Sequence, residues 1–258
     1  MIIGDRNFDG YTYVMAIVNL TPDSFFKDSR ATEDDVLFRV ERAVMQGAAV
    51  IDIGAQPTRP GYSEISAEEE IGRLEGAICR IKRNFDVPLS VDTYFSKCAD
   101  AALELGADMI NDVWGLTHDA DMAKVIAAHG ASVCIMHNAG KAIEGDVFSP
   151  VISFLKSSAE LAEKSGIPSD RICVDGGIGF AKSREQNFML LEGYERLKEV
   201  GYPLLLGTSR KSLFGGRVED RLPATLQSTR LAARKGVLFV RVHDVAENVQ
   251  AIREVYGD

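Results

Sequence analysis

Three observations predict that the chain folds as a (β/α)8 barrel. Short apolar runs alternate with segments of helical period along the chain, which is the order of a parallel sheet. The apolar runs number eight, and eight βα units close a barrel. The length of 258 residues suits the ~250 residues that such a barrel needs. A doubly wound open sheet is the alternative, because it alternates strands and helices in the same way.

The predicted strands are short and apolar at successive positions, the pattern of strands buried on both faces of a parallel sheet. In the run at 203–206, three leucines stop at Gly207, and hydroxyl and cationic side chains follow at once. The eight runs end near Val18, Ile53, Val91, Ile110, Met136, Val174, Leu206 and Val242.

Segments of helical period separate these runs. We expect helices at 33–46, 67–84, 96–105, 121–129, 151–165, 185–200, 223–235 and 245–256. At six junctions a glycine stands between the helix and the next strand, where the left-handed conformation ends a helix. These glycines are Gly47, Gly106, Gly130, Gly166, Gly201 and Gly236. Their recurrence indicates one βα unit used repeatedly.

The sequence shows no sign of a domain boundary. We expect residues 1–258 to form one domain, because no linker or low-complexity tract interrupts the alternation. Residues 1–13, which contain Gly4 and Gly10, precede the first strand. We expect them to form a small hairpin that covers the bottom of the barrel.

Composition limits the possible partners. A content of 46% hydrophobic and 26% charged residues is that of an ordinary soluble enzyme. The net charge of −9 argues against nonspecific binding to nucleic acids or anionic membranes, because both need a basic surface. It does not exclude anionic small substrates, since a site can be locally positive.

The four cysteines indicate a reducing compartment. They form no Cys-x-x-Cys pair, and we expect all of them to be small buried hydrophobic residues. They are Cys79, Cys98, Cys134 and Cys173. The N-terminus has no basic segment followed by a long apolar one, and no stretch is long enough to span a membrane. We therefore expect a cytoplasmic protein.

Polar side chains follow directly after the predicted strands. One aspartate at a strand end is most simply an N-cap, and we expect Asp112 and Asp244 to be capping or loop residues. Eight strands that converge on one mouth would bring the whole set into one pocket, where buried charges need partners or a ligand. The set consists of Asn19, Thr58, Arg59, Asp92, Asn111, His137, Asp175, Lys211, Arg241 and His243.

The residue types divide most of this set into two groups. Acceptors and one carboxamide suit a flat heterocycle with amino and ring N–H groups, and these are Asp92, Asn111 and Asp175. Donors suit phosphate oxygens, and these are Asn19, Thr58, Arg241 and His243. Lys211 fits either group. Taken alone, His243 is more simply a core histidine, and the glycines at 176–179 either turn the chain or let backbone approach a ligand.

Other chemistries are not indicated. A serine hydrolase would have a Gly-x-Ser-x-Gly elbow, which the chain lacks. A zinc site would need histidines or cysteines at close spacing, and the four histidines are scattered. A Schiff base at Lys211 is possible, but nothing in the neighbouring residues requires one.

Seven motifs together resemble those of dihydropteroate synthase. Each lies at the end of a predicted strand, and they run in order from about Val14 to the C-terminus. They are Asn-Leu-Thr-Pro-Asp-Ser-Phe at 19–25, Asp-Ile-Gly at 52–54 with Thr-Arg-Pro-Gly at 58–61, Ser-Val-Asp-Thr at 90–93, Ile-Asn-Asp-Val at 110–113, Asp-Gly-Gly-Ile-Gly-Phe at 175–180, Gly-Thr-Ser-Arg-Lys-Ser at 207–212 and Arg-Val-His-Asp-Val at 241–245.

The resemblance implies a (β/α)8 barrel, usually a homodimer, that joins 6-hydroxymethyl-7,8-dihydropterin diphosphate to 4-aminobenzoate and releases pyrophosphate. It implies a pterin site made by Asp92, Asn111, Met136, Asp175 and Lys211. It implies a diphosphate site made by Asn19, Thr58, Arg241 and His243, with Mg²⁺ near Asn19. It implies an aminobenzoate pocket shaped by Phe25, Pro60, Phe180 and Ser212. Lys211, Arg241 and His243 are then the catalytic residues.

The chain departs from the family in four loops. Asp-Gly-Gly at 175–177 replaces the usual Asp-Pro-Gly, which we expect to loosen that loop. Pro57 stands where a serine is usual, and residues 26–29 lack the usual glycine pair. The loop from His137 differs from the usual His-Met-x-Gly-x-Pro. We expect the loops at 21–29 and 137–145 to close over bound pterin and complete the aminobenzoate pocket.

Two other functions fit the same barrel. One is a pterin-dependent methyltransferase domain, against which the Ser-Arg-Lys-Ser and Arg-Val-His-Asp motifs count because they serve a diphosphate. The other is a non-catalytic paralogue that binds a pterin or only a partner. The altered loops favour the paralogue, whereas the retained Asp175, Lys211 and Arg241 count against it.

Overall fold

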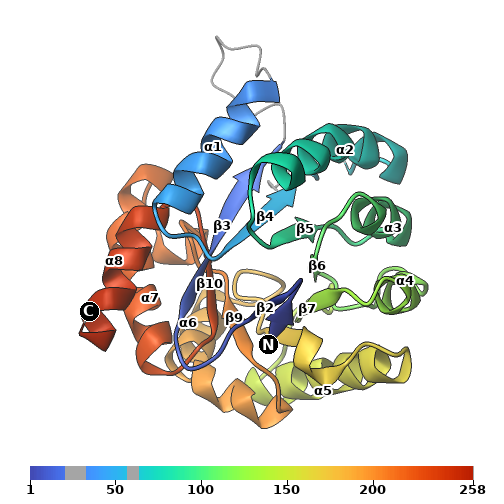
Figure 1. Cartoon of the computed structure of the whole chain (residues 1–258). Coiled ribbons are helices and arrows are strands. Elements are labelled where there is room, and N and C mark those ends of the chain that lie inside the picture. The colour runs from blue at the N-terminus through green and yellow to red at the C-terminus, as the bar shows by residue number, and fades with distance from the viewer. Residues whose placement is uncertain (21–32, 57–63, 258) are drawn as a thin grey trace.

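The computed structural model describes residues 1–20, 33–56 and 64–257, and its centre is a closed barrel of eight parallel strands (Figure 1). The strands follow one another around the barrel in the order β10-β3-β4-β5-β6-β7-β8-β9. This closure confirms the predicted barrel and excludes the open sheet. The strands are β3 (Tyr13–Asn19), β4 (Val50–Gly54), β5 (Leu89–Asp92), β6 (Met109–Asp112), β7 (Ser132–Met136), β8 (Ile172–Asp175), β9 (Leu204–Leu206) and β10 (Phe239–Val242).

Helices surround the barrel, as Figure 1 shows. They are α1 (Glu33–Met45), α2 (Ala67–Asn84), α3 (Ser96–Glu104), α4 (Met122–Ala128), α5 (Phe148–Lys164), α6 (Arg184–Glu192), α7 (Leu222–Arg234) and α8 (Val245–Tyr256). Short 3-10 helices are η2 (Ser169–Arg171), η3 (Tyr194–Val200), η4 (Ser212–Phe214) and η5 (Val218–Arg221). Of the described helices, none is long and apolar enough to cross a membrane.

The single helix expected at 185–200 is wrong. The segment divides at Gly193 into α6 and the 3-10 helix η3. A Cβ at Gly193 would lie 2.6 Å from Cζ of Phe148, so α5 packs too closely there for any larger residue. Glycine also favours a break in a helix, because it loses the most backbone freedom on folding.

The six junction glycines have the conformation that the sequence predicts. Their φ angles are +97° at Gly47, +100° at Gly106, +60° at Gly130, +103° at Gly166, +92° at Gly201 and +65° at Gly236. Residues with a Cβ rarely adopt such angles. Each glycine therefore ends its helical segment and returns the chain to the barrel.

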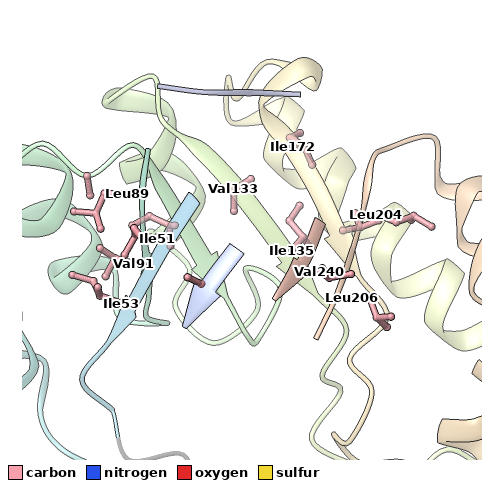
Figure 2. Packing of buried hydrophobic residues seen from close by; sticks show 14 of the residues in the cluster. Ile51, Ile53, Leu89, Val91, Val133, Ile135, Ile172, Leu204, Leu206 and Val240 are labelled. Carbon is pink, nitrogen blue, oxygen red and sulfur yellow. The ribbon is translucent and has the colours of Figure 1, made fainter. Parts of the chain in front are cut away.

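The core has two parts. Strand residues that face outward pack against the helices, and Figure 2 shows Ile51, Leu89, Val133 and other members of this cluster on their strands. A second, inner cluster fills the lower barrel with Met15, Val50, Met109, Cys134, Cys173, Leu205 and Phe239.

A two-stranded antiparallel hairpin closes the bottom of the barrel. It consists of β1 (Ile2–Ile3) and β2 (Arg6–Asn7). Ile3 and the following Phe8 belong to the inner cluster, and the Ser132 hydroxyl donates to the Ile2 carbonyl at 2.6 Å. Since the lower end is filled in this way, the opposite end holds the polar residues.

The four cysteines are free, but they are not all buried. Cys98, Cys134 and Cys173 are buried as expected, whereas Cys79 on α2 is only partly buried, which corrects the expectation for that residue. Its helix presents one face to solvent, and Cys79 lies next to the buried stripe formed by Ala77, Ile78 and Ile81.

Candidate active site at the mouth of the barrel

Alternation along the strands places charged side chains above the inner apolar cluster. Strand neighbours bring Asp92 beside Asn111 and Met136 beside Asp175. Asn111, Met136 and Asp175 are buried, and the Asp92 side chain is 12% exposed. The carboxyl ends of the strands therefore form one polar mouth, as the sequence predicts.

Arg241 joins two carboxylates across this mouth. Its Nε lies 2.6 Å from Oδ2 of Asp52, and its Nη2 lies 2.5 Å from Oδ2 of Asp92. The sequence-based division assigns Asp92 and Arg241 to different ligands, and in the structure the two side chains form an ion pair. Asp52 is fully buried, and its Oδ1 has no hydrogen-bond partner among the described residues. The network is therefore centred on Arg241, and one of its buried carboxylate oxygens lacks a hydrogen-bond donor among the described residues.

Burial and neighbouring charges shift the pKa values of Asp92 and Arg241. Burial and the nearby charge of Asp52 raise the pKa of Asp92 to about 6, although Arg241 opposes this shift. Burial would lower the pKa of Arg241, but the attraction of Asp52 and Asp92 outweighs it and raises the pKa. Arg241 is therefore charged at every physiological pH, and its charge supports ionised Asp92 near neutrality.

Asp175 is held from one side. Its Oδ1 accepts from the Gly177 amide at 2.8 Å and from the Tyr194 hydroxyl at 3.0 Å. A Cβ added at Gly207 would lie 3.5 Å from the other oxygen, Oδ2, and 4.0 Å from Nζ of Lys211. The glycine after β9 thus leaves space between a carboxylate and an ammonium group.

Two lysines hold the glycine loop that follows Asp175. Lys211 donates to the Ile178 carbonyl at 2.5 Å, and its Nζ lies 4.8 Å from the centre of the Phe180 ring. Lys182 donates to the carbonyls of Gly177 at 2.9 Å and Phe180 at 3.2 Å. Burial lowers the pKa of each lysine to about 8. Both ammonium groups are therefore mostly charged near neutral pH and can bind carbonyls or an anion.

Gly176, which the sequence analysis expects to loosen this loop, makes close contacts with the residues beneath it. Its amide donates to the buried Tyr194 hydroxyl at 2.9 Å, a bond that proline could not make. A Cβ at Gly176 would lie 2.8 Å from Cδ1 of Leu197 and 3.2 Å from Cε2 of Tyr194. Side chains therefore fill the space beneath the glycine and fix its backbone.

His243 lies at the edge of the mouth and is solvent-exposed, so the simpler alternative of a core histidine does not hold. The Ser209 hydroxyl accepts from the His243 amide at 3.1 Å and lies 3.0 Å from its Nδ1. These bonds fit a hydroxyl that donates to Nδ1 and leave Nε2–H for another partner.

Asp112 and Asp244 are loop and cap residues in different ways. Asp112 accepts from the amides of Trp114 and Leu116 at 2.8 Å each, as expected for a loop residue. Asp244 is the N-cap residue of α8, but its side chain makes no capping bond. It instead pairs with Arg210 through two contacts, at 2.7 and 2.8 Å.

The remaining candidates lie at different distances from this network. Asn19 ends β3, and its carbonyl accepts from Arg39 at 2.9 Å. Phe180 is partly buried beside Lys211, whereas Ser212 is exposed at the start of η4. His137 is buried at the end of β7 with its Nδ1 2.9 Å from Lys182. The sequence-predicted residues outside the described part of the chain are Phe25, Thr58, Arg59 and Pro60.

Sequence reasoning missed three residues of this site. Asp52 carried a signal, since it is a charge inside an apolar strand run, but its role depends on Arg241 from the far end of the chain. Lys182 lies in a polar loop and Tyr194 in a segment read as helix, and neither position differs from surface residues in the sequence. Their partners are set only by the folded arrangement.

Comparisons with known proteins all point to one protein family. The family model of pterin binding enzymes matches residues 15–243. A dihydropteroate synthase of Clostridium beijerinckii is 42% identical over 98% of this chain and 97% of its own length. The crystal structure of the dihydropteroate synthase of Clostridium difficile, determined in the presence of pteroic acid, has a TM-score of 0.94 and 41% identity over 98% of both chains.

A third relative carries a different ligand. The dihydropteroate synthase of Xanthomonas albilineans with 4-aminobenzoic acid has a TM-score of 0.91 and 37% identity, covering 96% of this chain and 93% of its own. The fold and the charged mouth define an enzyme of the pterin-binding barrel class. The chain belongs to the dihydropteroate synthases, which are transferases of folate biosynthesis.

Proposed function

We propose that the mouth of this barrel condenses 6-hydroxymethyl-7,8-dihydropterin diphosphate with 4-aminobenzoate, giving 7,8-dihydropteroate and pyrophosphate. The observation that carries the proposal is the convergence of Asp92, Asn111 and Asp175 with the cations Lys211 and Arg241 at one end of the barrel. Acceptors of this kind suit the N–H edge of a pterin, and the cations suit a diphosphate beside it.

Asp175 is the main pterin-recognising group in this proposal. A carboxylate held through Oδ1 presents Oδ2 in a fixed direction, so a ligand N–H meets an oriented acceptor. Asn111 adds a buried carboxamide, and Met136 lies beside Asp175 where it can pack on the face of the ring. Lys211 lies between the carboxylate and the glycine loop and would bind a pterin acceptor.

Arg241 and His243 would bind the diphosphate. A guanidinium carries five N–H donors, more than its two carboxylates use, so it can also serve an anionic oxygen. His243 offers Nε2–H from the rim. As the bond between the pterin methylene carbon and the diphosphate oxygen breaks, these donors stabilise the negative charge on the leaving group.

The amine of 4-aminobenzoate then attacks the methylene carbon, whose positive charge is delocalised into the pterin ring, and loses a proton. Phe180 and Ser212 would form the described part of its pocket, and Phe25 and Pro60 are proposed to complete it. The reaction needs no strong base, so most of the rate would come from positioning and charge stabilisation.

Mg²⁺ is part of the proposal, bound near Asn19. In the described part of the chain no group of three or more His, Cys, Asp or Glu side chains could hold a metal ion. The single carboxamide oxygen of Asn19 fits a Mg²⁺ ion that is held mainly by phosphate oxygens and water, its usual ligands in phosphate enzymes. When bound there, the ion would offset charge on the diphosphate.

Two further expectations remain part of this proposal. A homodimer is testable by light scattering, with a mass of twice 28.2 kDa as the expected result. A cytoplasmic location is in line with the four free cysteines.

The proposed reaction is tested by coupled detection of pyrophosphate with and without 4-aminobenzoate. We expect stoichiometric release that depends on the amine at steady state. The comparisons favour this activity over a methyltransferase, since the named relatives are synthases. Tight pterin binding without any pyrophosphate release would instead identify a non-catalytic paralogue.

A further inference from the structure

Tyr194 places a buried hydroxyl directly beneath the proposed pterin site. The residue opens η3 and is 1% exposed. Its hydroxyl oxygen accepts from the Gly176 amide at 2.9 Å and lies 3.0 Å from Oδ1 of Asp175 and 2.5 Å from the Leu205 carbonyl. One side chain thus connects β8, the glycine loop and β9 at the point where the mouth begins.

The hydroxyl is a permanent donor. Burial and the negative charge of Asp175 raise the pKa of Tyr194 well above its usual value, so the proton is retained at any working pH. That single proton is shared between the Leu205 carbonyl and the carboxylate. With the Gly177 amide on the same oxygen, Oδ1 of Asp175 is occupied by donors from the protein.

Gly176 and Tyr194 fit each other. The glycine supplies an amide that only a non-proline residue has, and the absence of a Cβ leaves room for the tyrosine ring and Leu197. A larger residue at 176 would come within 2.8–3.3 Å of Leu197, Tyr194 and Leu190. The glycine and the tyrosine are therefore interdependent: each uses the space or the hydrogen bond that the other provides.

We propose that Tyr194 is a positioning residue for pterin recognition and that it acts with Gly176 as a matched pair that orients Asp175. A proline at position 176 would stiffen this loop through its ring, whereas Gly176 and Tyr194 hold the loop through a buried hydrogen bond. This inference rests on the proposed function, because it assigns Asp175 the pterin contact. Tyr194 itself touches no substrate, and it acts by holding one carboxylate oxygen so that the other faces the ligand.

The first test measures binding of 6-hydroxymethylpterin by calorimetry to the full chain and to Tyr194→Phe. We expect about tenfold weaker binding in the variant, the size of a lost hydrogen bond to a charged group. Thr229→Val is the matched control, since it removes a buried hydroxyl that bonds Asn248 at 2.6 Å, away from the site. It should lower the melting temperature while leaving pterin affinity unchanged.

The second test uses mutual rescue. Gly176→Pro alone should weaken pterin binding and lower the melting temperature, because the ring meets Tyr194 and the amide bond is lost. Gly176→Pro combined with Tyr194→Leu should bind pterin more tightly than Gly176→Pro alone, since the smaller side chain makes room. If Gly176→Pro alone fails to fold, pterin binding can still be measured on the double variant. A double variant that binds pterin no more tightly than Gly176→Pro alone would overturn the matched pair.

The outcomes separate the inference from the proposed function. If the unmodified chain binds no pterin, the proposed function falls and this inference falls with it. If the unmodified chain binds pterin and Tyr194→Phe binds it equally well, only the inference is overturned. If Tyr194→Phe and Thr229→Val lose pterin affinity equally, the hydroxyl has a general stabilising role and no positioning role.

Discussion

Nζ of Lys182 lies 2.9 Å from Nδ1 of His137, so one ammonium group joins the loops that follow β7 and β8. With the carbonyls of Gly177 and Phe180, the three N–H donors of Lys182 have three acceptors. Burial and the nearby ammonium lower the pKa of His137 to about 4, so its ring is neutral and Nδ1 accepts. The two loops are therefore fixed relative to each other by a single side chain.

Lys182→Met should weaken 4-aminobenzoate binding more than pterin binding, because the loss frees the carbonyl of Phe180 and the loop that carries its ring. We expect a loss of about 1–3 kcal/mol in apparent affinity, typical of a buried polar group left without its partner. Binding is measured by calorimetry with pterin and pyrophosphate present. Lys164→Met, which removes an exposed lysine paired with Glu160 on α5, is the control. Equal losses for the two ligands would contradict the assignment of Phe180.

Asp175→Asn should abolish measurable pterin binding while the protein stays folded. The carboxylate would accept charge-assisted bonds from the pterin, and losing that charge should cost ~2–4 kcal/mol. Calorimetry gives the affinity and circular dichroism checks the fold. Asp170→Asn on the exposed η2 helix is the control. Pterin affinity equal to that of the unmodified chain would remove Asp175 from the site.

His243→Ala should weaken binding of the pterin diphosphate far more than binding of the bare hydroxymethyl pterin. The histidine lies at the rim and bonds only Ser209 among the described residues, so its loss leaves no buried charge behind. Comparing the two ligands separates a phosphate contact from general damage. A similar loss for both ligands would place His243 outside the phosphate site.

Arg241→Met should destabilise the fold as well as the diphosphate complex, because it leaves Asp52 and Asp92 buried without a cation. Removing one partner of a buried ion pair costs about 3–5 kcal/mol. The loss should shrink as the pH falls toward 6, because Arg241 limits the burial-driven rise in the pKa of Asp92 to about 6, and without the arginine Asp92 becomes neutral at a higher pH. Adding Asp92→Asn should restore part of the stability in urea unfolding at pH 8. No rescue would show that the ion pair is not the source of the loss.

Glu70 gives a pH-dependent stability prediction. It is fully buried on α2, where it accepts from Gln56 and Thr93, and burial raises its pKa to about 7. An acid whose folded-state pKa exceeds its unfolded value of about 4.3 binds more protons when folded, so stability falls as the pH rises between these values. The free energy of unfolding of Glu70→Gln should therefore rise relative to that of the unmodified chain, by about 3 kcal/mol between pH 5 and 7. Above pH 7 the difference between the two chains should stay constant.

Urea unfolding at several pH values measures this difference. Glu75→Gln, at an exposed position of the same helix, is the control and should show no such trend. A difference between Glu70→Gln and the unmodified chain that does not change with pH would mean that Glu70 titrates near its unfolded value.

The sequence by itself determined the barrel, the order of its elements and most of the residues at its mouth. Eight apolar runs, helical spacing and glycines such as Gly47 and Gly106 are local features, and each reports the backbone state of its own segment. A polar residue just past a buried strand is local as well, which is why Asp92, Asn111 and Asp175 could be identified from the chain alone.

Only the tertiary structure decided which of these residues act together. Arg241 contacts Asp52, 189 positions away in the sequence, and Tyr194 contacts both Asp175 and Leu205 from within a segment that the sequence predicted to be one helix. The sequence also could not show that the Gly176 amide bonds the Tyr194 hydroxyl or that Leu197 lies beneath the glycine. The physical reason is that hydrogen bonds and ion pairs depend on distances across the barrel, and these distances exist only once all eight strands have closed.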